Sequence, residues 1–184
     1  MRVLGIDPGL RRTGYGCIDL APNAPDPSLV EAGLIRLSPR ESVAERLRAL
    51  ATDLRELIVE LKPDRLAVEQ VFAHPKHVRT AILMAHARGV VVLAGAEAEL
   101  PMAELAPAEV KVAVAGHGRA GKAQVQQAVT VRCGLAVAPE PDDVSDAIAI
   151  AMCAAFRARE TPAAMLHEVQ RGGRRPGAGG EFGG

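Results

Sequence analysis

The chain has 184 residues, 48% of them hydrophobic and 24% charged, with a formal net charge of zero. This composition is typical of a folded globular protein and excludes a disordered or collagen-like chain. No apolar run approaches the roughly 20 residues that span a bilayer, and no signal-peptide pattern opens the chain, so we expect no membrane partner. Three scattered cysteines (Cys17, Cys133 and Cys153) are typical of reduced thiols, and we expect a cytoplasmic protein.

The charges are unevenly distributed even though they sum to zero. Residues 70–96 contain no acid but do contain Lys76, Arg79 and Arg88, and residues 110–139 again contain cations without any acid. This pattern indicates either a phosphate-binding surface or a chance cluster on a solvated face. Charge alone does not decide between the two.

The first part of the chain predicts three strands and a helix. Alternating apolar residues and turn signals favour a three-stranded meander. A capping-box pattern at Ser38–Glu41, with proline at the first helical position, then begins an amphipathic helix that runs to Leu61. The expected strands are Val3–Asp7, Tyr15–Leu20 and Leu29–Leu37.

The second part predicts two further strands and four helices. The helix over Lys76–Leu100 has few polar residues, and we expect it to be well buried. The order of elements indicates an α/β fold, a five-stranded mixed sheet with helices on both faces. One domain should cover residues 1–160, and a disordered tail rich in glycine and arginine should cover 168–184. The other expected elements are Arg65–Gln70, Pro101–Leu105, Pro107–Ala115, Lys122–Cys133 and Asp143–Arg159.

Four acids interrupt or adjoin apolar segments: Asp7, Glu69, Asp143 and Asp146. A carboxylate in a buried segment is costly unless something compensates its charge. Asp143 and Asp146 are three residues apart and share a helix face, and neighbouring first and fourth strands would bring Asp7 beside Glu69. Oxygen ligands favour Mg²⁺ or Mn²⁺, and two such ions suit phosphodiester hydrolysis.

Each acid also has a purely structural interpretation. Asp7 precedes Pro8-Gly9 and suits a turn, and Asp142 or Asp143 suits a helix N-cap. Glu69 would be unremarkable on an edge strand that faces water. Their coincidence in one chain carries more weight than any single residue.

Five segments, in this order, resemble the bacterial Holliday-junction resolvase family RuvC: LGIDPGLRRTGYG, LAVEQVF, ARGV, AEVKVAVAGHGRAGKAQVQ and DDVSDAIAIA. The resemblance extends to about Arg159 and implies a ribonuclease H-like fold. It implies that Asp7, Glu69, Asp143 and Asp146 are the catalytic, metal-binding acids, while Asp142 receives no role. Three further positions match DNA-binding residues of the family: Phe72, which would stack on a base, Lys111 and Lys122.

The resemblance also implies an activity. We expect a homodimer that resolves four-way junction DNA in recombination and repair by two symmetric, metal-dependent nicks, with two Mg²⁺ or Mn²⁺ ions per site. A branch-migration helicase complex of RuvA and RuvB is the expected protein partner.

Three other functions are weighed against this one. The turn after Asp7 resembles the phosphate-binding turn of actin-like ATPases and sugar kinases, but no second such turn follows a later strand. A ribonuclease H-like RNA-processing nuclease and a non-catalytic junction-binding protein are the remaining alternatives. Metal-dependent nicking of DNA, compared with RNA, distinguishes them.

Overall fold

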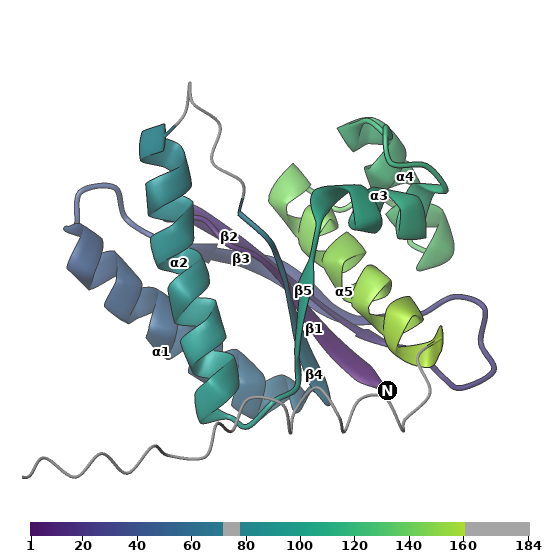
Figure 1. Ribbon diagram of the computed structural model, residues 1–184, viewed down its shortest axis with the longest axis horizontal. Helices are drawn as coiled ribbons and strands as arrows, with labels where there is room; N and C mark the ends of the chain where they lie inside the picture. Colours follow the sequence, from purple (N-terminus) through teal and green to yellow (C-terminus); the bar gives the residue numbers. More distant parts are fainter. Residues whose placement is uncertain (72–77, 161–184) are drawn as a thin grey trace, which may run out of the picture.

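The computed structural model describes residues 1–71 and 78–160 (Figure 1). Its five strands form one mixed sheet, as the sequence predicts, and their order is β3-β2-β1-β4-β5. β1 pairs antiparallel with β2 and parallel with β4, so the first and fourth strands are neighbours. The strands are β1 (Arg2–Asp7), β2 (Arg12–Asp19), β3 (Ser28–Arg36), β4 (Arg65–Glu69) and β5 (Met102–Leu105).

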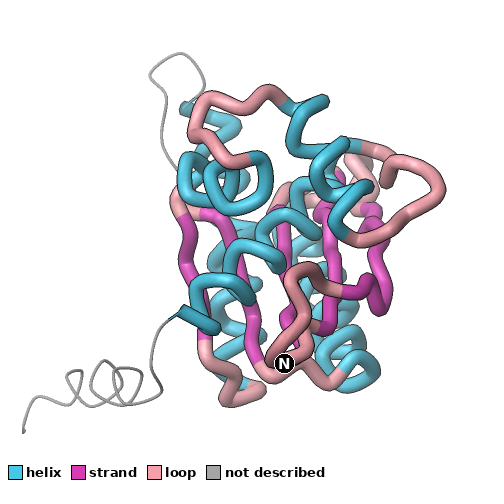
Figure 2. The backbone as a smooth tube through the Cα atoms, turned by 90° about the vertical axis from the view of Figure 1, so that its right-hand side faces the viewer, coloured by secondary structure: helices cyan, strands magenta, loops and turns pink. Residues whose placement is uncertain are grey.

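Helices cover both faces of this sheet. In Figure 1, α1 (Val43–Leu61) and α2 (Val78–Glu97) lie on one side. Figure 2 looks from the other side, where α3 (Pro107–Ala115), α4 (Lys122–Arg132) and α5 (Asp142–Glu160) lie in front of the strands. Two hydrophobic cores result, one against α3–α5 and one against α1 and α2.

α5 lies unusually close to the sheet because glycines in β1 and β2 leave room for its backbone. A Cβ atom on Gly5 would lie 2.3 Å from the carbonyl oxygen of Ala147, and one on Gly14 only 1.9 Å from that of Asp143. Neither strand can carry a side chain at these points without moving the helix. The glycines therefore fix the height of the α5 N-terminus above the sheet.

The first helix begins later than the sequence pattern predicts. We expected the cap at Ser38, but Ser42 caps α1: its hydroxyl accepts a hydrogen bond from Glu45 N at 3.2 Å, and the Glu45 carboxylate accepts one from Ser42 N at 2.8 Å. Ser42 and Glu45 have the same spacing as Ser38 and Glu41, and only the later pair closes reciprocally. Ser38 instead accepts a hydrogen bond from Arg40 N in a turn.

α2 is less buried than its composition indicates, so that expectation was wrong. Only Ala87, Val91, Ala94 and Gly95 are buried, whereas Val78, Ile82 and Leu93 are each about half exposed. By length and composition alone, this 20-residue helix is also apolar enough to cross a membrane, contrary to the expectation that no such segment exists. The helix uses small residues to pack and leaves larger apolar side chains on the surface.

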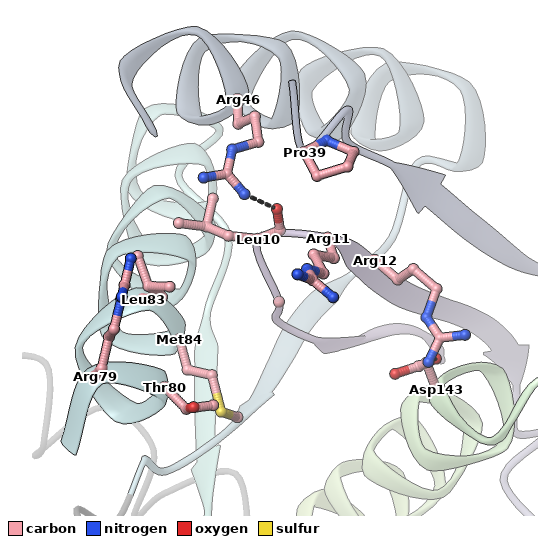
Figure 3. Close-up of a pocket in the computed structure, with 11 residues that line it drawn as sticks. Leu10, Arg11, Arg12, Pro39, Arg46, Arg79, Thr80, Leu83, Met84 and Asp143 are labelled. Carbon is pink, nitrogen blue, oxygen red and sulfur yellow. Dashed lines mark hydrogen bonds and ion pairs between the residues drawn. The ribbon is translucent and has the colours of Figure 1, made fainter. Parts of the chain in front are cut away.

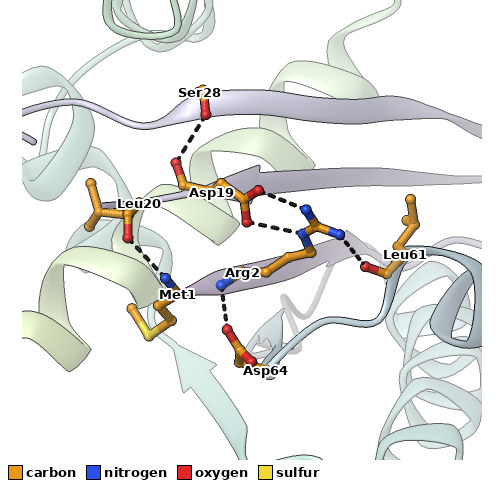
Figure 4. A network of polar contacts seen from close by, with 7 residues as sticks. All are labelled: Met1, Arg2, Asp19, Leu20, Ser28, Leu61 and Asp64. Atoms are coloured by element: carbon orange, nitrogen blue, oxygen red, sulfur yellow. Dashed lines mark hydrogen bonds and ion pairs between the residues drawn. The ribbon is translucent and has the colours of Figure 1, made fainter. Parts of the chain in front are cut away.

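The start of β1 is held by a dense polar network (Figure 4). The Arg2 guanidinium donates from Nε and Nη2 to the two carboxylate oxygens of Asp19, at 3.0 and 2.8 Å, and from Nη1 to the carbonyl of Leu61. The Asp64 carboxylate accepts the backbone N–H of Arg2. The charged groups of Arg2, Asp19 and Asp64 therefore each have a close partner, and these contacts anchor β1 to β2 and to the end of α1.

Candidate active site

The opposite end of β1 carries Asp7, and its neighbour in β4 is Glu69. The parallel register pairs Ile6 with Val68, which places Asp7 and Glu69 next to each other, one position further along. Ile6 and Val68 point into the core against α1 and α2. Because side chains alternate along a strand, Asp7 and Glu69 both point to the other face, where α5 lies.

α5 brings the remaining two acids to this point. Asp7 is also paired with Gly14 in β2, and the backbone of Asp143 lies directly over Gly14. Asp146 follows one helical turn later on the same side of α5. These contacts bring the four acids that the sequence singled out to one place, at the C-terminal ends of β1 and β4.

The electrostatics of these acids reflect that proximity. Burial, followed by the negative charges of Asp146, Glu69 and Asp143, raises the pKa of Asp7 to about 7. Burial and the charge of Asp146 raise the pKa of Glu69. Burial is also the main cause that raises the pKa of Asp146 above its usual range, with Asp142 and Asp143 adding to it. Repulsion of this kind marks a cluster that is short of positive charge.

Among the described residues, two cations form ion pairs with the α5 acids and partly neutralise the cluster. Arg12 of β2 places Nη2 at 3.1 Å from Asp143 Oδ2. Lys122, at the start of α4, places Nζ at 3.5 Å from Asp142 Oδ2 and 3.8 Å from Asp146 Oδ2. Burial lowers the pKa of Lys122, but Asp146 and Asp142 outweigh it and the net change is upward.

The donor set fits a hard divalent cation. Asp143 Oδ2 is buried and, apart from its ion pair with Arg12, has no hydrogen-bond partner, so it retains a lone pair for a ligand. In residues 1–71 and 78–160, no three acidic, histidine or cysteine side chains already surround a single point. In this arrangement Arg12 pairs with Asp143, and Lys122 contacts both Asp142 and Asp146. Carboxylate oxygens alone are the ligands that Mg²⁺ and Mn²⁺ prefer, and rotation of these side chains would allow them to bind.

Of the three predicted DNA-binding residues, two lie beside the acids and one lies outside the described residues. Lys111 of α3 and Lys122 line a small cavity of about 220 Å³ together with Glu69 and Asp146, so both lysines lie beside the acids. Phe72 and the tail at 168–184 lie outside the described residues, and their roles stay predictions.

Two charged residues at the site were missed or left without a role. Asp142 is the first residue of α5, and it pairs with Lys122. Arg12 was expected in a turn, but β2 begins there, three residues earlier than predicted. The Arg11-Arg12 doublet that follows Asp7 by a few residues was the only signal for it in the sequence.

A ribonuclease H-like sheet with four acids at the ends of β1 and β4 and at the start of α5 defines a class of metal-dependent nucleases. Comparison with known proteins agrees. Residues 3–154 match the family model described as crossover junction endodeoxyribonuclease RuvC. The chain therefore belongs to the RuvC family.

Individual relatives cover almost all of the described chain. The crossover junction endodeoxyribonuclease RuvC of Pelotomaculum thermopropionicum is 48% identical over 153 residues, which is 83% of this chain and 92% of the relative. That of Salinispora arenicola is 43% identical over 95% of this chain and its own full length. The structure of Thermus thermophilus RuvC in complex with Holliday junction substrate superposes with a TM-score of 0.81 at 35% identity, covering 86% of this chain and 95% of that one.

Proposed function

We propose that this protein is a divalent-metal-dependent endonuclease that resolves four-way DNA junctions by nicking two strands symmetrically. The observation that carries the proposal is the convergence of Asp7, Glu69, Asp143 and Asp146 on one face of the sheet, where nearby cations offset only part of the negative charge. Membership in the RuvC family, and the junction substrate in the related Thermus complex, support the substrate.

The chemistry follows from the residues. Two bound Mg²⁺ or Mn²⁺ ions would activate a water molecule and stabilise the leaving oxygen of an in-line displacement. Asp7, Glu69, Asp143 and Asp146 would hold these ions. Lys122 is 73% exposed and lies between Asp142 and Asp146, where its ammonium can approach a phosphate and offset developing negative charge. Lys111, which lines the same cavity as Glu69 and Asp146, would contact the DNA backbone beside the site, and Phe72 would stack on a base.

The test is cleavage of a synthetic mobile four-way junction, with Mg²⁺ and Mn²⁺ in parallel and nicks mapped at nucleotide resolution. Paired nicks at symmetric positions, absent without metal, are the expected result. An RNA of matched sequence serves as the control for an RNA-processing nuclease. Binding of the junction with no nick under any metal would instead identify a non-catalytic binder.

The homodimer is supported by the exposed side of α2. Val78, Ile82 and Leu93 lie on the surface at spacings that return to one side of the helix, and a Cβ atom added to Gly89 between them would have no atom within 4 Å. A second copy related by a twofold axis would cover this strip and present two active sites to one junction. Ile82→Glu should convert the dimer to monomer in analytical ultracentrifugation, and an unchanged dimer would contradict this interface.

Two further parts of the proposal concern the cellular setting. Cys17, Cys133 and Cys153 are unpaired, and burial raises the pKa of each thiol to about 11, which suits a reducing cytoplasm.

Association with a RuvA and RuvB complex on the junction is tested by co-migration of this protein with a junction loaded with both. No shift beyond the RuvA–RuvB–junction complex would contradict the association.

A further inference from the structure

A large basic cavity adjoins the acids on the side away from Lys122. It has a volume of about 1040 Å³ and lies between the β1–β2 turn, the start of α1 and the start of α2. Four arginines line it: Arg11, Arg12, Arg46 and Arg79. We call it the arginine pocket (Figure 3). The one acid in its lining is Asp143, which connects the pocket directly to the candidate active site.

The positive charge of this pocket is largely uncompensated. Arg46 donates from Nη1 to the carbonyl of Leu10 at 2.7 Å, which fixes its guanidinium, and its Nε is buried without a hydrogen-bond partner. Neither Arg46, Arg11 nor Arg79 forms a salt bridge with an acid among the described residues. Several guanidinium groups held together without carboxylates favour an anionic ligand.

The shape and lining of the pocket indicate which anion. Arginines from three separate segments of the chain line the pocket, beside apolar side chains such as Leu83 and Met84. Arginine matches the geometry of a phosphate through its planar fork of donors. A ligand that contacts both Asp143 and the arginines of the pocket must be an extended molecule, as a sugar–phosphate backbone is.

The acids lie between two cationic sites. Asp143 lines the arginine pocket, whereas Glu69 and Asp146 line the smaller cavity with Lys111 and Lys122. A strand whose scissile phosphate is at the acids would pass from the lysines on one side to the arginines on the other. Both flanks of the cut would then have their phosphates neutralised.

We propose that the arginine pocket binds a backbone phosphate of the cleaved DNA strand, next to the scissile phosphate, through Arg11 and Arg79. The inference rests on the proposed junction-cleaving function and adds a second contact site for the same strand. Arg46 supports the pocket from its fixed position, and Arg12 remains the partner of Asp143.

The experiment measures junction binding by the full chain made inactive with Asp7→Asn, over a series of salt concentrations. Adding Arg11→Ala and Arg79→Ala should weaken binding about tenfold or more at moderate salt. It should also reduce the slope of log K against log salt by about 1–2, because each phosphate contact releases roughly 0.9 counterion. Arg48→Ala is the matched control, an exposed arginine of α1 outside the pocket.

A second measurement locates the phosphate. Single phosphates around the cut are replaced by neutral methylphosphonates, and binding is compared between the Asp7→Asn protein and the Arg11→Ala, Arg79→Ala variant in the same background. At the contacted position, the neutral phosphate should weaken binding of the first protein and have no further effect on the second. Equal effects on both proteins at every position would overturn the proposal.

The outcomes separate the two levels of inference. If the Asp7→Asn protein does not bind the junction at all, the proposed function fails. If it binds and the double arginine variant has the affinity and salt slope of Arg48→Ala, only the arginine pocket is refuted. Thermal unfolding of each variant shows whether a loss of binding comes from loss of fold, and Arg79→Lys, which keeps the charge, should retain the salt slope.

Discussion

The charged residues at the two ends of β1 differ in how completely they are paired with opposite charges. At Arg2, a guanidinium is fully paired with Asp19 and with the end of α1. At Asp7, five residues later, acids from three elements lie together, and burial, followed by the negative charge of neighbouring acids, raises the pKa values of Asp7, Glu69 and Asp146. We call the Arg2 end the paired end, because its ion pairs stabilise the fold. We call the Asp7 end the underpaired end, because its carboxylates remain available for a ligand. The raised pKa values at one end of β1 thus distinguish a candidate functional site from the structural network at the other end.

The largest expected effect tests the underpaired end. Asp7→Asn should reduce junction cleavage by about 10³-fold or more, because metal ions supply several kcal/mol of transition-state stabilisation and the rate changes tenfold for each 1.4 kcal/mol. Junction affinity should change little. Single-turnover cleavage and fluorescence anisotropy measure the two quantities. The matched control is Glu56→Gln, an exposed acid of α1, and cleavage by Asp7→Asn at the control rate would show that the metal site is misassigned.

Lys122 should have the next largest effect. Lys122→Ala removes the ammonium that lies nearest Asp146, and we expect cleavage to fall about 10²-fold while junction affinity falls only a few-fold. Lys122→Arg, which keeps the charge, should recover part of the rate. The comparison is made under single-turnover conditions, so that product release does not obscure the chemical step.

The Asp142→Asn substitution measures what the ion pair between Asp142 and Lys122 contributes to the cleavage rate. If Asp142 only orients that lysine, its loss should lower the rate a few-fold in the native protein and have no effect in a Lys122→Ala background. Equal effects in both backgrounds would indicate that Asp142 acts on the metal site directly.

The two ends should also respond oppositely to pH. The pKa of Asp7 in the folded protein, about 7, lies above its unfolded value, so the metal-free fold loses stability as pH rises from about 4 to about 7. Asp19 behaves in the reverse sense: hydrogen bonds from Arg2 lower its pKa, and its stabilising contribution is lost as pH falls through the acidic range.

Thermal unfolding across pH, with and without Mg²⁺, measures this difference. Above pH 7, Mg²⁺ should raise Tm more than at pH 5, because binding requires deprotonated acids. Asp7→Asn should stabilise the metal-free protein above pH 7 by about 1–3 kcal/mol and flatten its pH dependence. A metal-free Tm that rises between pH 5 and 8 in the native protein and falls on this substitution would contradict the assigned electrostatics.

The smallest effect is expected at the paired end. Arg2→Met removes the guanidinium that joins Asp19 and the Leu61 carbonyl, and Tm should fall by a few degrees. Cleavage per folded molecule should remain at the native rate, since this network lies at the opposite end of the strand from the acids. A loss of cleavage without a loss of stability would refute the division between the two ends.

Much of this architecture could be predicted from local patterns. Alternation placed the strands to within a few residues, and a charged side chain inside each apolar segment identified Asp7, Glu69 and the α5 pair. These features depend on periodicity and on the cost of burying charge, and both are visible in a single segment of sequence.

Other features were decided only by tertiary packing. Whether Ser38 or Ser42 caps α1, and which face of α2 is exposed, depends on how each helix meets the sheet. The pairing of Arg12 with Asp143, and the gathering of Arg46 and Arg79 into one pocket, join segments that are far apart in the chain. The sequence by itself singled out the four acids that we propose to carry the chemistry. The tertiary structure decided which cations face them, because the glycines of β1 and β2 let the start of α5 approach the sheet closely enough for those charges to meet.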